Sequence, residues 1–273
     1  MKNKPFYIVL VILLLIIIVV IYKNPKTKEE AKINNQDVST VNEEDVVAGT
    51  FETKTLNPDD AYVKIDVKYP YFKNADAGFN LRIENFLKNG IEEHKNISKD
   101  NWQARFETQT AGENIPKVPA KEEEKFYFYS DYTVIQSNST YISFVLIYGG
   151  YSGGAHGYEN RVSYNYDLKN HKDVMLKDLF PNNPQYLNYI SERSRESLKK
   201  AYATPSEEDK KNSSQEDLKA YFDNILSMID IGTEPKEENF TAFTFTDEKV
   251  KIYFGQYQVG PYAIGSPEVE IKR

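Results

Sequence analysis

The chain of 273 residues contains no cysteine and only three histidines, His94, His156 and His171. Without cysteine it has no disulfide, thiol nucleophile, thiolate metal site or cysteine-linked lipid anchor. The histidines form no His-x-x-x-His pair, so we predict neither a metal site nor a cofactor. Basic residues number 34 against 41 acidic ones, a net charge of −7. Phosphate backbones bind to clustered Lys and Arg, so we expect no nucleic acid among the partners.

One long apolar run, residues 6–22, lies near the start of the sequence. Its uncharged length spans a hydrocarbon core as a helix, and Lys2, Lys4 and Lys23 can reach the interfaces. No Ala-x-Ala cleavage site follows, which favours an uncleaved anchor over a signal peptide. Lys2 and Lys4 favour a cytoplasmic N-terminus. We therefore predict a single-pass protein of the cell membrane with an extracytoplasmic C-terminal part, and removing Lys2 and Lys4 from −7 leaves that part at −9.

Residues 23–58 are polar, carry charges of both signs and show no sustained hydrophobic period, which predicts a flexible stalk. Hydrophobic residues make up 40% of the chain and aromatic residues 14%, which excludes general disorder and indicates a strand-rich core. An exported domain without cysteine must be stabilised by that core alone, which fits a bacterial cell surface.

After the stalk, the apolar residues switch between the strand period and the helix period. Residues 62–69 alternate as a half-buried strand that Pro70 should end, and residues 76–93 repeat at helical spacing. Residues 102–108 alternate again, which predicts a further strand. The remaining predicted strands are a hairpin of 126–136 with 140–148, then 161–167, 241–246, 250–254 and 269–271.

Capping signals predict two more helices. Asn183 as N-cap and Pro184 at the first position predict a helix over 185–202. The capping box Ser213-x-x-Glu216 opens a further helix, with a buried stripe of Leu218, Tyr221, Phe222, Ile225, Leu226 and Ile229. Strands and helices are grouped and do not strictly alternate. The predicted fold class is therefore α+β, with antiparallel sheets and three main helices behind one N-terminal transmembrane helix.

Residues 150–154, Gly-Tyr-Ser-Gly-Gly, match the Gly-x-Ser-x-Gly pattern of a nucleophile elbow. That elbow needs a strand before the serine and a helix after it, but an alternating strand follows here. His156 lies on the same loop, which does not by itself make a catalytic dyad. We therefore predict that the chain is not an enzyme. A serine hydrolase built on Ser152 ranks third, behind a module that captures a protein and a module that binds a cell-wall glycan.

The glycine-rich segment of residues 149–157 has two interpretations that are compatible with each other. One is a wide strand connection whose glycines permit positive φ, with His156 bonded to neighbouring carbonyls. The other is a shaped loop with Tyr151 and Tyr158 at its margins, which offers aromatic contact area to a partner.

A second loop, residues 257–262, ends in Gly-Pro-Tyr and is predicted to be stiff because Pro261 fixes φ. A tyrosine held on a rigid loop is an efficient anchor, so we expect Tyr262 to contact a partner. The alternative is that Tyr262 packs inward and that its loss costs stability instead. The candidate binding residues are Tyr151, Ser152, His156, Tyr158, Pro261 and Tyr262.

Several motifs in one order resemble a known family. They are the glycine-rich segment 148–157, Tyr164-Asn165-Tyr166-Asp167-Leu168, Leu176-x-Asp178-Leu179-Phe180 and Tyr257-Gln258-Val259-Gly260-Pro261-Tyr262. This order resembles the RsiV-like C-terminal domain, a family of exported bacterial modules. Residues 61–97 resemble the domain known from the amino-terminal part of the peptidoglycan deacetylase PdaC. The chain then divides into an anchor (1–22), a stalk (23–58), a PdaC-like domain (59–148) and an RsiV-like domain (149–273).

The resemblance implies a function in binding. In the family, this pair of domains forms the ectodomain of lysozyme-sensing anti-sigma-V factors or precedes a deacetylase domain. Neither a cytoplasmic regulator nor a deacetylase domain is expected in this sequence, so the resemblance implies an anchored binding module. We expect it to capture a protein partner such as a lysozyme-like hydrolase, and its acidic charge would steer a basic partner. The alternative is a module that binds peptidoglycan glycan with surface tyrosines as stacking platforms.

One local departure from the family lies in the turn after Lys169. The family usually has glycine where this sequence has His171, so Asn170 is expected to take the left-handed position instead.

Overall fold

The computed structural model describes residue 47, residues 50–110 and residues 112–273. The predicted anchor, residues 6–22, and most of the predicted stalk lie outside these residues, so both stay predictions. Within the described residues, none of the helices combines the length and the apolar character needed to cross a bilayer.

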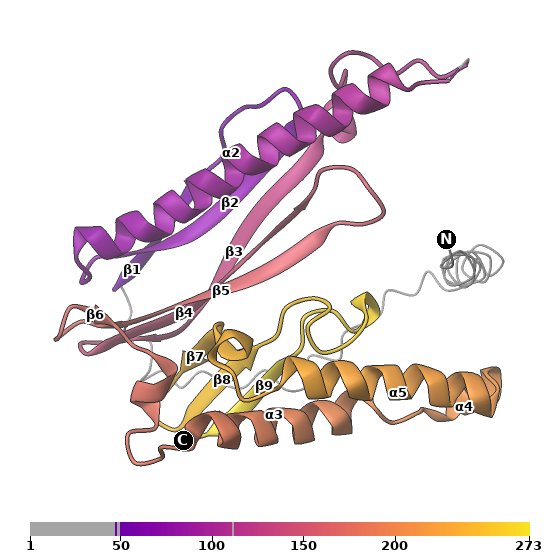
Figure 1. Ribbon diagram of the computed structural model, residues 1–273. Coiled ribbons are helices and arrows are strands. Elements are labelled where there is room, and N and C mark those ends of the chain that lie inside the picture. Colours follow the sequence, from indigo (N-terminus) through magenta and orange to yellow (C-terminus); the bar gives the residue numbers. More distant parts are fainter. Residues whose placement is uncertain (1–46, 48–49, 111) are drawn as a thin grey trace, which may run out of the picture. The chain divides into compact units, whose positions relative to one another are not determined.

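The first sheet has six strands, which lie side by side in chain order (Figure 1): β1 (Phe51–Leu56), β2 (Val63–Phe72), β3 (Phe126–Ser137), β4 (Tyr141–Tyr151), β5 (Tyr158–Asp167) and β6 (Lys172–Asp173). Neighbouring strands are antiparallel except β2 and β3, which are parallel. The predicted α+β class is confirmed, but the prediction of purely antiparallel sheets is wrong. A parallel pair needs a long crossover, and a helix between β2 and β3 supplies it.

That crossover is α2 (Ala77–Glu107), which lies along one face of the first sheet (Figure 1). The Asp76 carboxylate caps it by accepting from the Phe79 N–H at 2.8 Å. Its buried residues recur every three or four positions as far as Trp102, which is why the helix continues beyond residue 93. The predicted strand over 102–108 is therefore wrong. Trp102 is buried and donates its indole N–H to the Pro116 carbonyl at 2.9 Å, whereas the residues after it are more exposed.

Two strand boundaries differ from the prediction. Strand β1 forms inside the segment predicted as stalk, because its residues pair in register with β2 from Phe51↔Phe72 to Leu56↔Val67. Strand β2 continues through Pro70 to Phe72. Pro70 lies beyond Val67, the last β2 residue that pairs with β3, so its missing N–H removes no hydrogen bond from that ladder.

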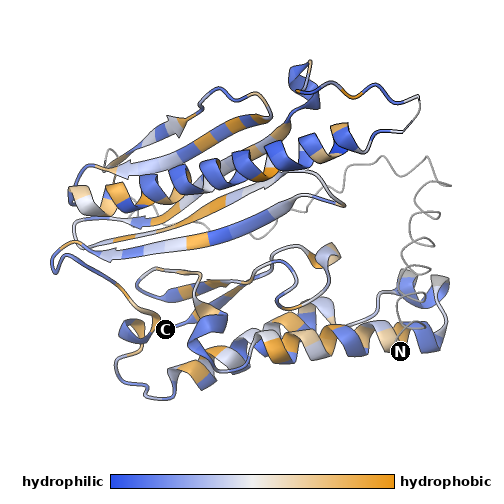
Figure 2. Ribbon diagram, turned by 45° about the horizontal axis from the view of Figure 1, so that its top comes forward, coloured by the Kyte–Doolittle hydropathy of each residue, from blue (hydrophilic) through white to orange (hydrophobic). Residues whose placement is uncertain are grey.

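The core of the first sheet lies between its strands and α2. Figure 2 shows apolar and polar residues alternating along these strands, as the burial of β2 does from Val63 to Lys68. The apolar set of β2, which includes Val63 and Ile65, clusters with Ile83 and Leu87 of α2. The opposite set of β2 therefore faces away from the helix.

The second half of the chain builds an antiparallel sheet of three strands in the order β7 (Phe243–Phe245), β8 (Lys249–Tyr253) and β9 (Glu268–Lys272). Helices α3 (Tyr186–Tyr202) and α5 (Gln215–Gly232) lie along it, and a short α4 (Glu207–Asn212) joins them (Figure 1). Ile190 and Ile229 are fully buried in the core that these helices share with the sheet. The predicted strands and both predicted helices are confirmed in their approximate positions.

Three local predictions about this half need correction. Helix α3 begins at Tyr186 because the Asn183 side chain accepts from the Gln185 N–H at 3.0 Å, forming a turn before the helix instead of its cap. Helix α5 is capped by Ser214, not Ser213, through the Asp217 N–H. Tyr221, predicted to lie in the buried stripe, is exposed.

The turn after Asp167 also differs from the prediction. His171 takes the left-handed conformation at φ 51°, not Asn170. The reason is that the Asp167 carboxylate accepts from the backbone N–H groups of Lys169 and Asn170 and from the Asn170 side chain. These bonds hold Asn170 within the turn, so the chain reverses one residue later.

Polar side chains join the two sheets. Ser143 donates to the Asn165 side-chain oxygen at 2.7 Å and accepts from the Phe245 N–H at 2.9 Å. Asn165 donates to the Phe243 carbonyl at 2.7 Å, and Ser163 accepts from the Phe243 N–H at 2.9 Å. Ser143 and Asn165 are buried. We call the side chains of Ser143, Ser163 and Asn165 the polar joint.

Candidate functional site

Two loops that are far apart in the sequence meet at one surface. The loop between β4 and β5 carries His156, and the loop between β8 and β9 carries Tyr257 and Tyr262. The rings of His156 and Tyr262 stack with their centroids 4.1 Å apart and an interplanar angle of 28°. The second ring nitrogen of His156, Nε2, lies 3.1 Å from the Tyr257 hydroxyl. We call these three residues the histidine–tyrosine cluster.

Hydrogen bonds fix the ring of His156 in this cluster. Its Nδ1 lies 2.8 Å from the Gly157 carbonyl, which can only accept, so the neutral ring carries its proton on Nδ1. Nε2 then accepts from the Tyr257 hydroxyl. The Tyr262 hydroxyl donates to the same Gly157 carbonyl at 3.3 Å. The three aromatic side chains therefore hold one another in place.

The second loop is held rigidly by its own residues. The Gln258 side chain accepts from the Gly255 N–H and donates to the carbonyls of Gly232 and Asn239, at 2.9 to 3.1 Å. Tyr257 has a φ of 65°, a conformation that is uncommon for a residue with a side chain and that this network must maintain. The loop is thus ordered before any partner binds.

The predicted anchor residues of this loop lie at the surface. Pro261, with φ at −65°, precedes the short 3₁₀ turn Tyr262–Ile264. Tyr262 is 36% exposed and Tyr257 is 51% exposed, and His156 is exposed beside them. The alternative that Tyr262 packs into the core does not hold, because its contacts are with His156 and Gly157 at the surface.

Ser152 lies at the base of the first loop, and its carbonyl accepts from the Asn101 side chain of α2 at 2.6 Å. Strand β4 ends at Tyr151 and strand β5 begins at Tyr158, so no helix follows the serine in this part of the described chain. Both ring nitrogens of His156 are engaged by Gly157 and Tyr257. The Gly-x-Ser-x-Gly sequence therefore does not form a strand–turn–helix elbow here.

The other two candidate tyrosines point in different directions. The Tyr158 hydroxyl lies 3.0 Å from Nδ1 of the buried His94 of α2. Burial raises the pKa of Tyr158 to about 12 and lowers the pKa of His94. Tyr151 donates to the Gly154 carbonyl at 3.0 Å, and its ring packs against Phe126. Tyr158 therefore packs against α2 and is not part of the histidine–tyrosine cluster.

The glycine-rich segment is shorter as a loop than predicted. Gly149 and Gly150 belong to β4, where they pair with Glu159 and Tyr158. A Cβ on Gly150 would lie 2.7 Å from Cε1 of His94, so this glycine makes room for a side chain of α2.

Sequence reasoning missed three exposed or half-buried tyrosines near this surface: Tyr257, Tyr127 and Tyr129. Tyr257 lies at the start of the 257–262 loop, whose Gly-Pro-Tyr ending points to Tyr262 and not to Tyr257. Tyr127 and Tyr129 alternate with Phe126 and Phe128 along β3, and this alternation was the available signal. In a strand with one buried face, phenylalanine takes the buried positions and tyrosine can keep its hydroxyl at the surface.

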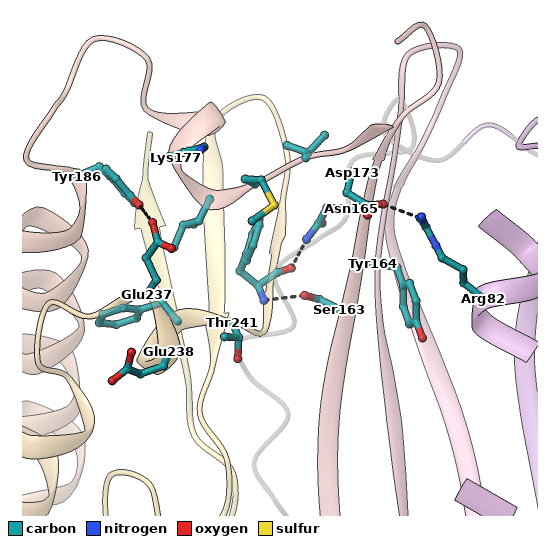
Figure 3. Close-up of a pocket in the computed structure, with 15 residues that line it drawn as sticks. Arg82, Ser163, Tyr164, Asn165, Asp173, Lys177, Tyr186, Glu237, Glu238 and Thr241 are labelled. Carbon is teal, nitrogen blue, oxygen red and sulfur yellow. Dashed lines mark hydrogen bonds and ion pairs between the residues drawn. The ribbon is translucent and has the colours of Figure 1, made fainter. Parts of the chain in front are cut away.

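The structure also contains a cavity of about 440 Å³ beside the polar joint (Figure 3). Figure 3 shows Arg82 and Asp173 on one side of it, paired at 2.6 Å, and Tyr186 and Glu237 on the other, bonded at 3.0 Å. Burial and the bond to Glu237 raise the pKa of Tyr186 to about 12. None of the candidate residues predicted from the sequence lines this cavity.

No group of three or more His, Asp or Glu side chains in the described part of the chain is arranged to hold a metal ion.

Comparisons with known proteins match both halves of the described chain. The family model described as Deacetylase PdaC matches residues 56–159, and the one described as Protein of unknown function (DUF3298) matches residues 177–273. The peptidoglycan-N-acetylmuramic acid deacetylase PdaC of Bacillus subtilis (strain 168) is 24% identical over 272 residues. This alignment covers 99% of the chain and 49% of that relative, so the chain spans about half the relative's length.

One solved structure has a similar fold, and a second gives a weaker match. A DUF3298 family member from Bacteroides fragilis superposes with a TM-score of 0.50 at 17% identity, over 82% of this chain and 91% of the other. A DUF3298 family protein from Pseudomonas aeruginosa PAO1 has a TM-score of 0.43 at 16% identity, over 81% and 90%. The PdaC-like resemblance seen in the sequence is confirmed, and the RsiV-like one stays a prediction. Residues 56–159 are thus similar to a PdaC domain, and residues 177–273 are similar to a DUF3298 domain.

Proposed function

We propose that this chain is an extracytoplasmic binding module of the bacterial cell envelope, anchored in the membrane by residues 6–22. The wall setting is supported by the two matched domains, because the Bacillus subtilis relative is named as a deacetylase of peptidoglycan N-acetylmuramic acid. The chain spans about half of that relative, so the relative's reaction is not part of the proposal. In the proposal, the module binds and does not catalyse.

The observation that carries the proposal is the histidine–tyrosine cluster. Three aromatic side chains from two loops are exposed together and are already fixed by hydrogen bonds and stacking. Tyrosine on a rigid loop gives a large contact area and loses little conformational entropy on binding. Such clusters have the composition and the preorganisation of protein-binding hot spots.

The charge of the chain favours a basic protein as the partner. A net charge of −7 attracts a cationic protein during diffusion and repels an acidic one. We propose a lysozyme-like hydrolase as this partner, which is the partner that the RsiV-like resemblance implies. The module would then protect the wall or sense the hydrolase.

Calorimetric titration of the purified protein with lysozyme tests the proposal. Tyr262→Ala removes the ring that stacks on His156, and we expect it to weaken binding by about 2 kcal/mol, roughly 30-fold. Tyr262→Phe keeps the stacked ring and should keep most of the affinity. The matched control is Tyr221→Ala on α5, which removes a tyrosine that is 46% exposed and should leave the affinity unchanged.

Two results would contradict the proposal: no binding of lysozyme by the parent protein, or equal binding by Tyr262→Ala. Thermal melts run beside the titrations separate binding from folding. A large fall in Tm for Tyr262→Ala would assign the residue a structural role instead, whereas its exposed position predicts a small one.

A further inference from the structure

The face of the first sheet opposite α2 carries an ordered arrangement of side chains across its strands. Lys64 of β2, Tyr127 of β3 and Tyr151 of β4 pair in one row, as the register of the three strands requires. Lys64 is exposed, and its neighbours Val63 and Ile65 are buried on the α2 side. The row therefore lies on the face of the first sheet away from α2, the face from which Ser143 of β4 also reaches the second sheet.

The next row along the strands begins with Asp66 and continues with Tyr129, Gly149 and Glu159. A Cβ on Gly149 would lie 3.1 Å from the ring of Tyr129, so the ring lies against the backbone of β4 at this glycine. The Tyr129 hydroxyl reaches across β4 and donates to the Glu159 carboxylate at 2.9 Å. The tyrosine thus has a carboxylate of β2 on one side and one of β5 on the other.

The two rows together make a continuous aromatic surface. The rings of Tyr127 and Tyr129 lie 6.4 Å apart at an angle of 30°, and those of Tyr127 and Tyr151 lie 6.3 Å apart at 31°. Tyr127 is 45% exposed. We call Lys64, Asp66, Tyr127, Tyr129, Tyr151 and Glu159 the tyrosine face.

A groove of about 430 Å³ runs beside these residues. Asp66 and Tyr129 line it, and so do Glu122 and Lys125, which pair at 2.7 Å. Neighbouring rings flanked by carboxylates and lysines suit a ligand that has apolar faces and many hydroxyl groups. A sugar ring has both, because its C–H face packs on an aromatic ring while its hydroxyls bond to charged groups at the rim.

We propose that the tyrosine face binds a glycan chain of N-acetylhexosamine units. Successive sugars stack on Tyr127 and Tyr129, Asp66 accepts from their hydroxyls, and Lys64 donates to an acetamido carbonyl. The carboxylates disfavour a phosphate-bearing chain, which the same rings would otherwise suit. The choice of N-acetylated sugars rests on the wall setting of the proposed function, whereas the site uses residues outside the histidine–tyrosine cluster.

Calorimetric titrations of the full chain with chitohexaose, soluble peptidoglycan strands and cellohexaose test this inference. We expect the two N-acetylated glycans to bind and cellohexaose to bind at least tenfold more weakly. Tyr127→Ala should weaken glycan binding at least tenfold, and Tyr127→Phe should retain it because the ring remains. Tyr221→Ala is the control, since it removes an equally exposed tyrosine elsewhere.

The glycan titrations distinguish glycan binding by the tyrosine face from protein capture by the histidine–tyrosine cluster. If the parent binds none of the glycans, or if Tyr127→Ala binds them as the parent does while its melt is unchanged, the site is refuted. Equal binding of cellohexaose would refute the assignment to N-acetylated sugars. Asp66→Asn serves as a second variant that leaves the aromatic packing intact, and we expect a fivefold or greater loss. Tyr127→Ala should bind lysozyme as tightly as the parent does. A failure of protein capture would therefore appear only in the lysozyme titrations, and a failure of glycan binding only in the glycan titrations.

Discussion

The polar joint makes a specific prediction about stability, because Asn165 holds both sheets. Its side chain accepts from Ser143 of β4 at 2.7 Å and donates to the Phe243 carbonyl of β7 at 2.7 Å. The residue is buried, so water cannot easily replace either partner. Asn165→Ala removes both hydrogen bonds and leaves the Phe243 carbonyl without the donor that satisfies it.

The size of the effect follows from these two bonds. A buried hydrogen bond contributes about 1 kcal/mol net, and a buried group left without its partner costs about 1–3 kcal/mol. We therefore expect Asn165→Ala to lower the free energy of unfolding by about 3 kcal/mol. For a domain of this size, each kcal/mol shifts Tm by about 2–4 °C, so Tm should fall by roughly 6–12 °C.

Urea denaturation followed by circular dichroism, together with calorimetric melts, measures this change. The control is Asn160→Ala on the same strand, where the asparagine is exposed, and its effect should stay within about 0.5 kcal/mol. A loss below about 1 kcal/mol for Asn165→Ala would refute the reasoning, since it would mean that the joint does not hold the sheets together.

Three further changes have expected results. Gly150→Ala should destabilise the fold by about 2–3 kcal/mol in urea titrations, because the added Cβ would overlap the Tyr127 carbonyl oxygen; a neutral effect would refute the close packing. Burial lowers the pKa of His94 below its ordinary value of 6.5, so the unfolded chain takes up this proton first and the free energy of unfolding falls as pH drops below about 6.5. His94→Phe should reduce that slope, measured by urea titrations at several pH values, and an unchanged slope would count against it. Ser152→Ala should leave the stability of the fold unchanged, and esterase turnover should stay at background. An esterase activity of the parent that is lost in this variant would overturn the binding proposal.

Local patterns predicted most elements of the fold, and the failures have local causes. Trp102 and Phe106 alternate as in a strand, but the helical stripe of α2 reaches Trp102 at the same spacing that began at Phe79. A two-residue period and a helical period share positions over such a short stretch, and tertiary packing decided between them. The sequence pattern does not predict strand β1, because most of its residues are polar. They adopt the extended conformation because they pair with β2.

The candidate site was predictable in its parts but not in its assembly. Pro261 and Tyr262 were identified from loop chemistry, and His156 from its glycine-rich setting. Their contact depends on two loops 101 residues apart at His156 and Tyr257, which no period or spacing in the sequence encodes. Tyr158 shows the opposite case, since the pairing of β5 turns its side chain toward α2 and His94.

The polar joint has a consequence for how this protein can be divided. Strand β7 is an edge strand of its three-stranded sheet, so one of its edges has no strand beside it. Unpaired backbone groups on such an edge are a template for pairing with another chain. Here the Phe243 and Phe245 N–H groups and the Phe243 carbonyl are occupied by side chains from β4 and β5.

Two of those side chains, Ser163 and Asn165, fall between residues 159 and 177, in the stretch that neither family model covers. A fragment that begins at residue 177 would keep β7 but lose all three of the side chains that block its edge. Such a fragment is expected to associate through β7 or to aggregate, whereas one that begins before β4 keeps the edge protected. A fragment that keeps the edge of β7 covered must therefore be larger than the DUF3298 match itself.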